Sequence, residues 1–474
     1  MTMMTAAAAS AQLQAAFTED ITYRYDHAGR LVEETHSLNR REPVLLCRNT
    51  YDELGRLSVS ERGVSPSLTT SYTYNVRSWT TGISGPLYGE TLHYEDLRAA
   101  CLPESSRRYG GDVSSAEWRA SGDANVRSYD YEYDGLGRLT AAEYGEDGRP
   151  LVGYGTSYVY DMNGNVVSLQ REGDLTYTSK GTVDDLTMTY DGNRLVGVSD
   201  TAAEPQVYGS GDFRDCASGA QEYSYDLNGN LTCDLNAGIR RMTYDAAGYP
   251  SEVDRVDGAE SYAYLSDGTK LGTVVTRPDR SEVRTDYRGN LVYEGGRLKY
   301  LLLDGGLVSM DGRAPEYVLF LKDHLGSTRV SAGPDGTVYQ VNHYYPYGLS
   351  YATGTTATSQ LAADGGELVK LPDLGVVPGV SEEIPGPLPP ASALRHPYRF
   401  LGNELNLERG RPVYDFKARQ YDPALGRFQS VDPLSERYYG MSPYSYCGGS
   451  PVNSLDPDGR KIIFASGVSE VLSI

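Results

Sequence analysis

Residues 133–139 read Tyr-Asp-Gly-Leu-Gly-Arg-Leu, and this run decides the fold because it recurs along the chain. Residues 160–166 read Tyr-Asp-Met-Asn-Gly-Asn-Val, and residues 225–231 read Tyr-Asp-Leu-Asn-Gly-Asn-Leu. The shared pattern is Tyr-Asp, a short spacer, Gly, then Arg or Asn, then Leu or Val. A motif that returns in this way indicates a repeat array. Further copies, several of them shortened, begin at Tyr25, Tyr51, Tyr190, Tyr244 and Tyr287.

Each position of the motif has a mechanical reason. The Tyr ends a strand, and the Asp can accept a bond from the backbone two residues on and so start a turn. The Gly supplies the positive φ that closes a tight hairpin, and the Leu or Val opens the return strand. The flanks at 21–25 and 129–133 alternate with period two, with aromatic side chains on one face. The sequence therefore predicts tandem β-hairpins that stack into a continuous, curved sheet.

The composition fits thin β-walls. The 474 residues include 40 Tyr but only 7 Phe and 2 Trp, and 53 are Gly. Tyr favours strands and carries a polar hydroxyl, so it suits positions where the ring packs against a sheet and the hydroxyl reaches solvent. A chain of this length exceeds one ordinary core, but repeats bury their apolar faces only against their neighbours. We expect an all-β fold in which hairpins spiral into a shell that is partial or open, with exposed strand edges.

Charge and cysteine content exclude several classes of function. The net charge of −21 opposes binding to nucleic acid and to anionic lipid. The five cysteines include no CxxC pair, so zinc-ligand spacing and a dense disulfide framework are absent. No apolar run is long enough to span a membrane. Residues 1–20 lack the pattern of a signal peptide and are expected to be disordered.

The segment from residue 317 carries a second set of motifs. Residues 317–330 read Tyr-Val-Leu-Phe-Leu-Lys-Asp-His-Leu-Gly-Ser-Thr-Arg-Val, and residues 344–348 read Tyr-Tyr-Pro-Tyr-Gly. Residues 414–423 read Tyr-Asp-Phe-Lys-Ala-Arg-Gln-Tyr-Asp-Pro. Two Asp-Pro motifs follow, at Asp432 and Asp456. Residues 352–396 between these motifs are rich in Pro, Gly, Thr and Ala, which predicts a flexible surface insert.

These features resemble the YD repeats of the RHS (rearrangement hotspot) family, followed by an RHS repeat-associated core domain. The family includes the C components of insecticidal Tc toxins and the extracellular region of teneurins. The resemblance implies repeats over 21–316, a core over 317–459 that caps the β-shell, and a short tail at 460–474 in place of a toxin domain. In many members the core cuts the chain just beyond itself, and the released toxin domain stays inside the shell.

Asp432 and Asp456 are the candidate catalytic residues. Family members that cut themselves are proposed to use paired aspartates in such Asp-Pro contexts. Two close carboxylates cannot both ionise, so one stays protonated as an acid while the other activates water. The alternative is that Asp-Pro only starts turns. Two departures from the family pattern, Val431 where Arg is common and Ser435 where Gly is common, favour that alternative.

Other polar groups have simpler interpretations. Asp323, His324 and Ser327 are sequence neighbours and are expected to form a hydrogen-bonded turn, since a catalytic triad is defined by geometry and not by adjacency. Residues 161–165 resemble a calcium loop but lack its distal Glu. We expect no cofactor and no metal.

Two functions remain open at this stage. The first is the shell-forming carrier portion of a bacterial polymorphic toxin used in contact-dependent competition, secreted or on the cell surface, and able to cut itself at the end of the core. Its partners would be a toxin domain, secretion machinery or an N-terminal repeat-bearing partner, and an immunity protein. The second is a non-catalytic cell-surface adhesion protein whose repeat tyrosines bind carbohydrate.

Overall fold

A computed structural model describes residues 17–96, 107–176, 178–203, 205, 212–217, 219, 221–310, 314–351, 396–406 and 412–465. Almost all regular structure in these ranges is antiparallel β-sheet, as expected. Most of residues 1–20, the insert and the end of the tail lie outside the described ranges, although the first strand already begins at Glu19. None of the described helices is long and apolar enough to cross a bilayer.

The first sheet has 15 strands, and chain neighbours pair in sequence order except that β11 pairs only with β10. The order of a meander follows directly from stacked hairpins. Its strands are β1 (Glu19–Tyr25), β2 (Leu31–Leu38), β3 (Val44–Tyr51), β4 (Leu57–Glu61), β5 (Thr70–Tyr74), β6 (Thr80–Ser84), β7 (Tyr88–His93), β8 (Ser115–Ala120), β9 (Arg127–Tyr133), β10 (Leu139–Glu146), β11 (Arg149–Pro150), β12 (Thr156–Tyr160), β13 (Val166–Thr176), β14 (Ser179–Asp191) and β15 (Arg194–Asp200).

The second sheet continues the same meander with 13 strands. It runs past the expected repeat boundary at 316, so the start of the core motifs is continuous with the repeat sheet. Its strands are β16 (Tyr223–Tyr225), β17 (Leu231–Asp234), β18 (Ile239–Tyr244), β19 (Pro250–Arg255), β20 (Ala259–Tyr264), β21 (Lys270–Thr276), β22 (Glu282–Arg288), β23 (Leu291–Glu294), β24 (Arg297–Leu303), β25 (Gly306–Ser309), β26 (Glu316–Lys322), β27 (Thr328–Ala332) and β28 (Val338–Val341).

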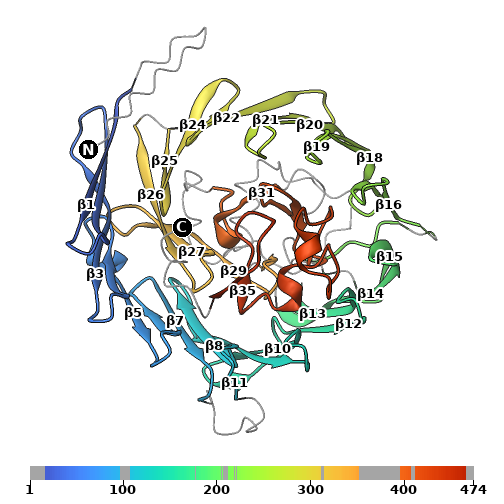
Figure 1. The fold of residues 1–474 in the computed structure, drawn as a ribbon, viewed down its shortest axis with the longest axis horizontal. Helices are drawn as coiled ribbons and strands as arrows, with labels where there is room; N and C mark the ends of the chain where they lie inside the picture. Colours follow the sequence, from blue (N-terminus) through green and yellow to red (C-terminus); the bar gives the residue numbers. More distant parts are fainter. Residues whose placement is uncertain are drawn as a thin grey trace, which may run out of the picture.

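The remaining elements are short, and all of them except η1 lie inside the ring. They are β29 (His343–Tyr344), β30 (Ser350–Tyr351), β31 (Glu404–Asn406), β32 (Val413–Asp415), β33 (Gln420–Asp422), β34 (Arg427–Phe428), β35 (Ser454–Leu455), β36 (Ile463–Phe464) and the 3-10 turns η1 (Pro66–Leu68, on the wall), η3 (Phe400–Gly402), η4 (Ser435–Arg437) and η5 (Cys447–Gly449). Figure 1 shows the segments after β30 enclosed by the wall of the two large sheets.

The wall makes one turn of a spiral, and its last strands lie inside its first strands (Figure 1). The ring of buried His36 on β2 meets the Tyr317 hydroxyl on β26 at 2.8 Å. Beyond β4, the backbone of Val64 donates to the carbonyl of Pro334 at 2.8 Å. Within the described residues β1 pairs only with β2, so the wall overlaps but does not close as a barrel, and the outer edge of β1 stays open, as expected.

The repeat motif forms the predicted turn. Asp134 Oδ1 accepts from the backbone N–H groups of Leu136 at 2.9 Å and Arg138 at 3.0 Å. Gly137 has φ +79°, which closes the hairpin between β9 and β10. The Arg138 side chain donates to the second oxygen of Asp134 at 2.6 Å. One aspartate therefore fixes both the backbone and the arginine of its own repeat.

Successive hairpins are joined by a contact that the motif alone did not reveal. The Arg138 guanidinium lies over the Tyr160 ring of the next repeat, 4.8 Å from its centre, and the Tyr160 hydroxyl donates to the carbonyl of Leu139 at 2.6 Å. A cation over a tyrosine face is stabilising by about 0.5–1 kcal/mol at such sites. The same hydroxyl-to-carbonyl bond recurs from Tyr51 to Leu31, Tyr74 to Leu57, Tyr190 to Val166 and Tyr244 to Leu231.

The enclosed core is held by aromatic packing and by bonds to the wall. Phe400, Phe416, Tyr421, Phe428 and Tyr446 are buried and in mutual ring contact. Hydrogen bonds also join the core to the wall. The hydroxyls of Tyr345 and Tyr444 in the core donate to the carbonyls of Glu172 and Gly229 on the wall, and Arg171 on the wall donates to the carbonyl of Ala424 in the core. The cysteines of the described part, four in number, are free.

Candidate functional site

The structure brings together the two aspartates that the sequence singled out, and it adds an arginine between them. One terminal nitrogen of Arg419 lies 2.9 Å from Asp432 Oδ2 and 3.0 Å from Asp456 Oδ2. All three side chains are buried, with Asp456 only 1% exposed. The two carboxylates are therefore neighbours bridged by a single guanidinium.

Each member of this triad is placed by its local backbone. Arg419 ends the turn between β32 and β33, and its guanidinium stacks 3.6 Å from the centre of the Phe428 ring. Asp432 begins the turn after β34, where its Oδ1 accepts from the N–H of Leu434 at 2.7 Å. Asp456 directly follows β35, and its Oδ1 accepts from the N–H of Arg460 at 2.9 Å. In both aspartates, Oδ1 therefore fixes the turn and Oδ2 pairs with Arg419.

The charges of the triad do not balance. Burial raises the pKa of Asp432 and of Asp456, and the partly compensating attraction to Arg419 is shared between them. Asp458 adds a further negative charge that acts on both carboxyls. Burial also lowers the pKa of Arg419. Because one cation faces two buried carboxyls, a proton held by one of them brings the triad to neutrality, which is the division of roles that acid–base chemistry needs.

Sequence reasoning missed Arg419. It lies within the motif at 414–423, which served above only for the resemblance to the core domain. A charged side chain flanked by Phe416, Tyr421 and Phe428 is a signal for a buried ion pair, because arginine is rarely buried without a partner. Nothing in the local sequence gives the identity of its partners, which lie 13 and 37 positions further along the chain.

The other sequence candidates are turns. Asp323 Oδ1 accepts from the N–H groups of Leu325 and Ser327, which is the geometry of the repeat turn, and His324 leaves this turn to pair with buried Glu90 on β7 at 3.0 Å. In the loop at 161–165, Asp161 Oδ1 accepts from two backbone N–H groups and Oδ2 accepts from the Asn165 amide. Both segments serve as hairpin ends.

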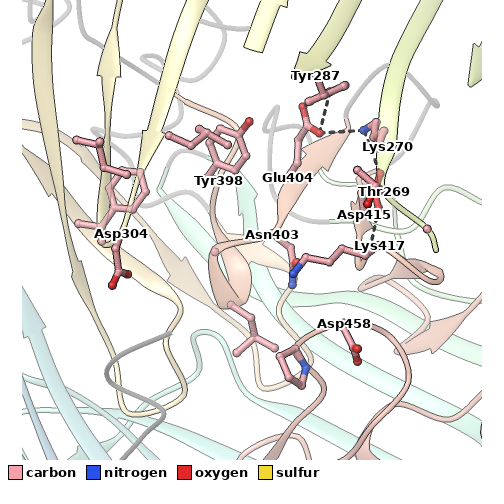
Figure 2. A pocket seen from close by; sticks show the side chains of 18 of the residues that line it. Thr269, Lys270, Tyr287, Asp304, Tyr398, Asn403, Glu404, Asp415, Lys417 and Asp458 are labelled. Carbon is pink, nitrogen blue, oxygen red and sulfur yellow. Dashed lines mark hydrogen bonds and ion pairs between the residues drawn. The ribbon is translucent and has the colours of Figure 1, made fainter. Parts of the chain in front are cut away.

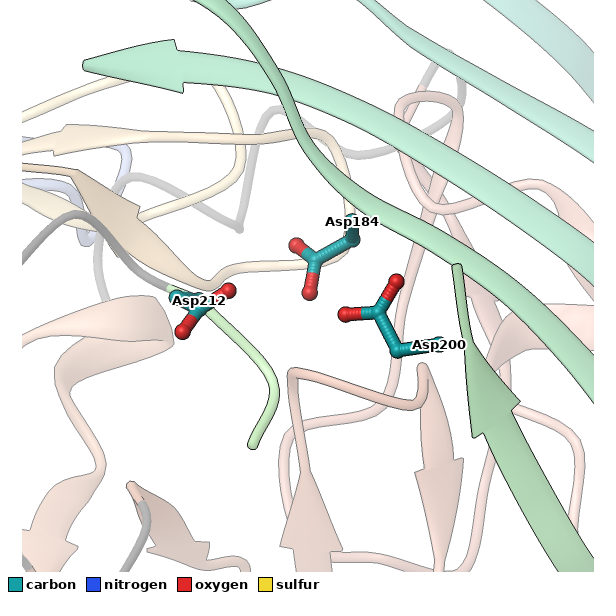
Figure 3. A group of neighbouring side chains, drawn as sticks. All are labelled: Asp184, Asp200 and Asp212. Atoms are coloured by element: carbon teal, nitrogen blue, oxygen red, sulfur yellow. The ribbon is translucent and has the colours of Figure 1, made fainter. Parts of the chain in front are cut away.

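A cluster of three carboxylates was not expected. Oxygens of Asp184, Asp200 and Asp212 lie within 4.8 Å of one another beside β14 and β15 (Figure 3). Burial and the two neighbouring carboxylates raise the pKa of Asp212 to about 7. Asp184 is paired with Arg171 at 2.6 Å and accepts from the N–H of Phe213, so its charge is compensated within the protein.

A cleft of about 610 Å³ lies between the core and the part of the wall from the turn before β21 to β26. Figure 2 shows Lys270 projecting from the wall toward Glu404 and Asp415 of the core, at 2.9 and 3.0 Å. The Tyr287 hydroxyl donates to the same glutamate at 2.8 Å. Arg460, next to the aspartate pair, also lines this cleft. The cleft therefore adjoins the candidate site on the side of the chain that follows Asp456.

Comparison with known proteins identifies the fold but shows no family for the chain. No family model matches the chain. A stretch of 63 residues, 13% of the chain, is 48% identical to salivary gland surface protein 1 of Aedes aegypti, of which it covers 2%.

Two solved structures are similar over most of the chain. A crystal structure of TcdB2-TccC3 with Cdc42 matches 94% of it with a TM-score of 0.53 at 18% identity. The Tc holotoxin pore of Photorhabdus luminescens, carrying a substitution in TccC3, matches 96% of it with a TM-score of 0.53 at 16% identity. The chain spans about one fifth of each matched structure, 20% and 21%. The chain thus shares the β-shell fold of part of these Tc toxin complexes.

Proposed function

We propose that this chain is the carrier portion of a bacterial polymorphic toxin, secreted or displayed at the cell surface and used in contact-dependent competition. The observation that carries the proposal is a repeat wall wrapped around a core, in a fold shared with Tc toxin complexes. The wall is built to enclose material, since its hairpins curve through a full turn. Its passenger would be a toxin domain, and its further partners are a secretion machinery and an immunity protein.

The open edge of β1 supports a repeat-bearing partner. In later repeats the tyrosine hydroxyl donates to a carbonyl of the preceding hairpin, and at three junctions an arginine of that hairpin covers the ring. Tyr25 of the first repeat is 57% exposed, and among the described residues its hydroxyl has no such acceptor. A preceding hairpin with Arg and Leu in the motif positions would complete this contact.

Self-cleavage at the end of the core is part of the proposal. Asp432 and Asp456 are buried and bridged by Arg419, and burial raises the pKa of both carboxyls, so one proton held by the pair would neutralise the triad. Asp456 accepts from the backbone N–H groups of Arg460 and Lys461, and Arg419 donates to the carbonyl of Gly459, which supports action on this chain itself. The alternative role, a static ion-pair clasp, uses the same contacts but predicts an intact chain.

Protease protection tests the carrier role. A flexible, protease-sensitive passenger is fused after Ile474 or, as the matched control, before Met1. We expect the first passenger to be digested at least about ten times more slowly than the second, because it enters the shell. Equal digestion of the two passengers, with the shell itself intact, would contradict a carrier role.

The second candidate function, carbohydrate-binding adhesion, rests on the exposed tyrosines of β1. Tyr23 and Tyr25 are 50% and 57% exposed and stack with their ring centres 6.4 Å apart, which presents an aromatic platform of the kind that binds sugar rings. Glycan-array binding that disappears in Tyr23→Ala and Tyr25→Ala, and persists in a control such as Tyr439→Ala at another exposed ring, would favour this function over the carrier role.

A further inference from the structure

The two ends of the wall overlap, with the last strands as the inner layer, and this overlap buries Glu34 of β2 (Figure 1). Its side chain is 4% exposed, and among the described residues its carboxyl group accepts no hydrogen bond and forms no ion pair. Burial raises its pKa, and Asp304, in the turn between β24 and β25 of the inner layer, raises it further. Because a buried charge without a partner is costly, the closed overlap favours the protonated form of Glu34.

The exposed face of the same strands holds its carboxylates differently. Successive side chains of a strand point to opposite faces, so Glu33 lies on the other side of β2 from Glu34. Glu33 is paired with Arg24 on β1 at 3.2 Å and with Arg48 on β3 at 2.9 Å. Two adjacent glutamates therefore differ in that the exposed one has two arginines and the buried one has none.

The neighbours of Glu34 on the buried face of the sheet do not neutralise its charge. Tyr23 on β1 and Cys47 on β3 are in register with it, and neither side chain is a cation. Arg62, which lowers its pKa, follows β4 and so lies two strands away, about 10 Å along the sheet. Burial and Asp304 outweigh this attraction, and the pKa of Glu34 is raised to about 7.

Arg62 is also engaged by the inner layer. Its Nη1 donates to the carbonyl of Gly305 at 3.3 Å, in the turn that carries Asp304. Lys322, at the end of β26, is the second cation near this turn; burial and Arg62 lower its pKa, whereas Asp304 raises it. An ionised Glu34 would therefore place a second negative charge opposite Asp304, while the arginine between the layers already serves a backbone carbonyl.

We propose that Glu34 is a pH-sensitive switch of the overlap. While its carboxyl group is protonated the two ends of the wall stay packed together, and once it is ionised the overlap loosens and water reaches the charge. The raised pKa sets the direction of the effect. The closed state is fully favoured below the ordinary value of 4.5, and it loses this advantage as pH rises, until the effect levels off above about 7.

The turn that faces Glu34 also has a side toward the interior. Asp304, Gly305 and Gly306 line the cleft of about 610 Å³ between wall and core, together with Lys322. Loosening of the overlap would therefore open a lateral route from solvent to this cleft. The switch is independent of self-cleavage and of the nature of any passenger.

Three native cysteines allow a direct test on the full chain. Cys47 is buried in the overlap, Cys447 is buried in the core and Cys216 is exposed. The chain is labelled with iodoacetamide at pH 5.5 and at pH 8, and mass spectrometry of its peptides gives the labelling rate of each thiol. Each rate is divided by that of the urea-unfolded chain at the same pH, which removes the effect of pH on the thiol itself. We expect the ratio at Cys47 to rise about 10-fold to 30-fold between these pH values, and the ratios at Cys216 and Cys447 to stay constant.

Substitutions assign the effect to Glu34. Glu34→Gln keeps the shape of the side chain but cannot ionise, so its ratio at Cys47 should be the same at both pH values. Glu33→Gln is the matched control on the opposite face of β2, and it should keep the wild-type rise. Asp304→Asn removes the like charge opposite Glu34, so its rise should be smaller and complete at a lower pH, which also tests the switch if Glu34→Gln does not fold.

Four results would overturn the proposal. The first is a wild-type ratio at Cys47 that is equal at both pH values, and the second is a rise in Glu34→Gln as large as in the wild type. The third is an equal rise at Cys447, which would mean general unfolding in place of a loosened overlap. The fourth is an unchanged pH response in Asp304→Asn, which would show that the charges facing Glu34 do not set the switch.

Discussion

Aspartates in the wall and in the core start the same kind of turn but carry their charge differently. Asp134 in the wall has its own arginine four residues away; partial burial opposes ionisation, yet hydrogen bonds from Arg138 hold the pKa of this carboxyl below its usual value. In the core, Asp432 and Asp456 share Arg419, and burial raises the pKa of both. The ratio of cations to carboxyls, more than the local motif, decides which aspartate can exchange a proton.

The largest expected effect separates these two kinds of aspartate. Asp432→Asn should stop self-cleavage, slowing it on the order of 1,000-fold or more, because the pair can no longer take a proton from water. Asp134→Asn should cleave at the wild-type rate but lose about 1 kcal/mol of stability, because its hydrogen bond to Arg138 is weakened. Intact-mass measurements and thermal unfolding check both variants, and equal cleavage in the two would remove the distinction.

The contacts between wall and core should make stability depend on pH at both ends of the range. The Trp118 indole donates to His343 Nδ1 at 3.2 Å, so this histidine is neutral, and burial lowers its pKa to about 4. A lowered histidine pKa means that stability is complete above the ordinary value near 6.5 and falls as pH drops through about 4. The loss attributable to His343 is ~3 kcal/mol.

His324 behaves in the opposite way. Burial opposes its charge, but Glu90 raises its pKa to about 9. Its contribution is therefore complete below about 6.5 and is lost as pH rises through about 9, again by ~3 kcal/mol. Urea unfolding across pH tests both histidines, with His343→Gln and His324→Gln expected to flatten the acid and the alkaline limb, respectively. A wild-type curve that is flat between pH 4 and 9 would contradict both assignments.

A smaller effect tests the wall turn alone. Gly137→Ala should cost about 1–2 kcal/mol, because φ is +79° there and an L side chain is strained in that region. Gly135→Ala, in the same turn, should be nearly neutral, since Gly135 does not have a left-handed φ and a carbon added to it meets nothing within 4 Å. Equal free energies of unfolding for the two variants would show that the turn is not the element that the motif specifies.

The smallest expected effect concerns the junction between hairpins. Tyr160→Phe removes the bond to the carbonyl of Leu139 and should cost about 1 kcal/mol. Tyr25→Phe removes a hydroxyl at the open edge of β1 and should change stability by less than about 0.5 kcal/mol. Chemical denaturation measures both, and a partner hairpin seated on β1 would reveal itself by raising the cost of the second substitution.

The wall was predictable because each hairpin is specified within about seven residues. Tyr133 ends β9, Gly137 closes the turn and Leu139 opens β10, as the motif required. Hairpins without the motif were not recognisable in this way. The turn between β20 and β21 uses the backbone of Leu265 in place of an aspartate, and the long hairpin of β13 and β14 has no Tyr-Asp start.

The site was only half predictable. The two aspartates stood out through the resemblance to a family whose self-cleaving members are proposed to use aspartates in such Asp-Pro contexts, but their partner Arg419 could not be assigned from spacing. The overlap of β2 with β26 was likewise invisible, because it depends on the accumulated curvature of more than twenty hairpin strands and joins positions 281 residues apart. The hairpin turns are specified by residues close together in the sequence, whereas the spiral and the triad depend on residues far apart along the chain.

A disulfide between Ser65 and Gly336 tests the spiral most directly. A carbon placed on Gly336 would lie 3.3 Å from the Ser65 Cβ, close to the separation found in disulfides. The same carbon would lie 2.2 Å from the Ser67 Oγ, so both double variants also carry Ser67→Ala, and the φ of +87° at Gly336 adds a cost of about 1–2 kcal/mol to any side chain there. Ser65→Cys with Gly336→Cys should therefore oxidise to a bond that peptide mapping finds between these positions, and Ser65→Cys with Met162→Cys, on a distant hairpin, should not. Free thiols at both 65 and 336 in the folded, oxidised protein would contradict a wall whose last strands lie inside its first.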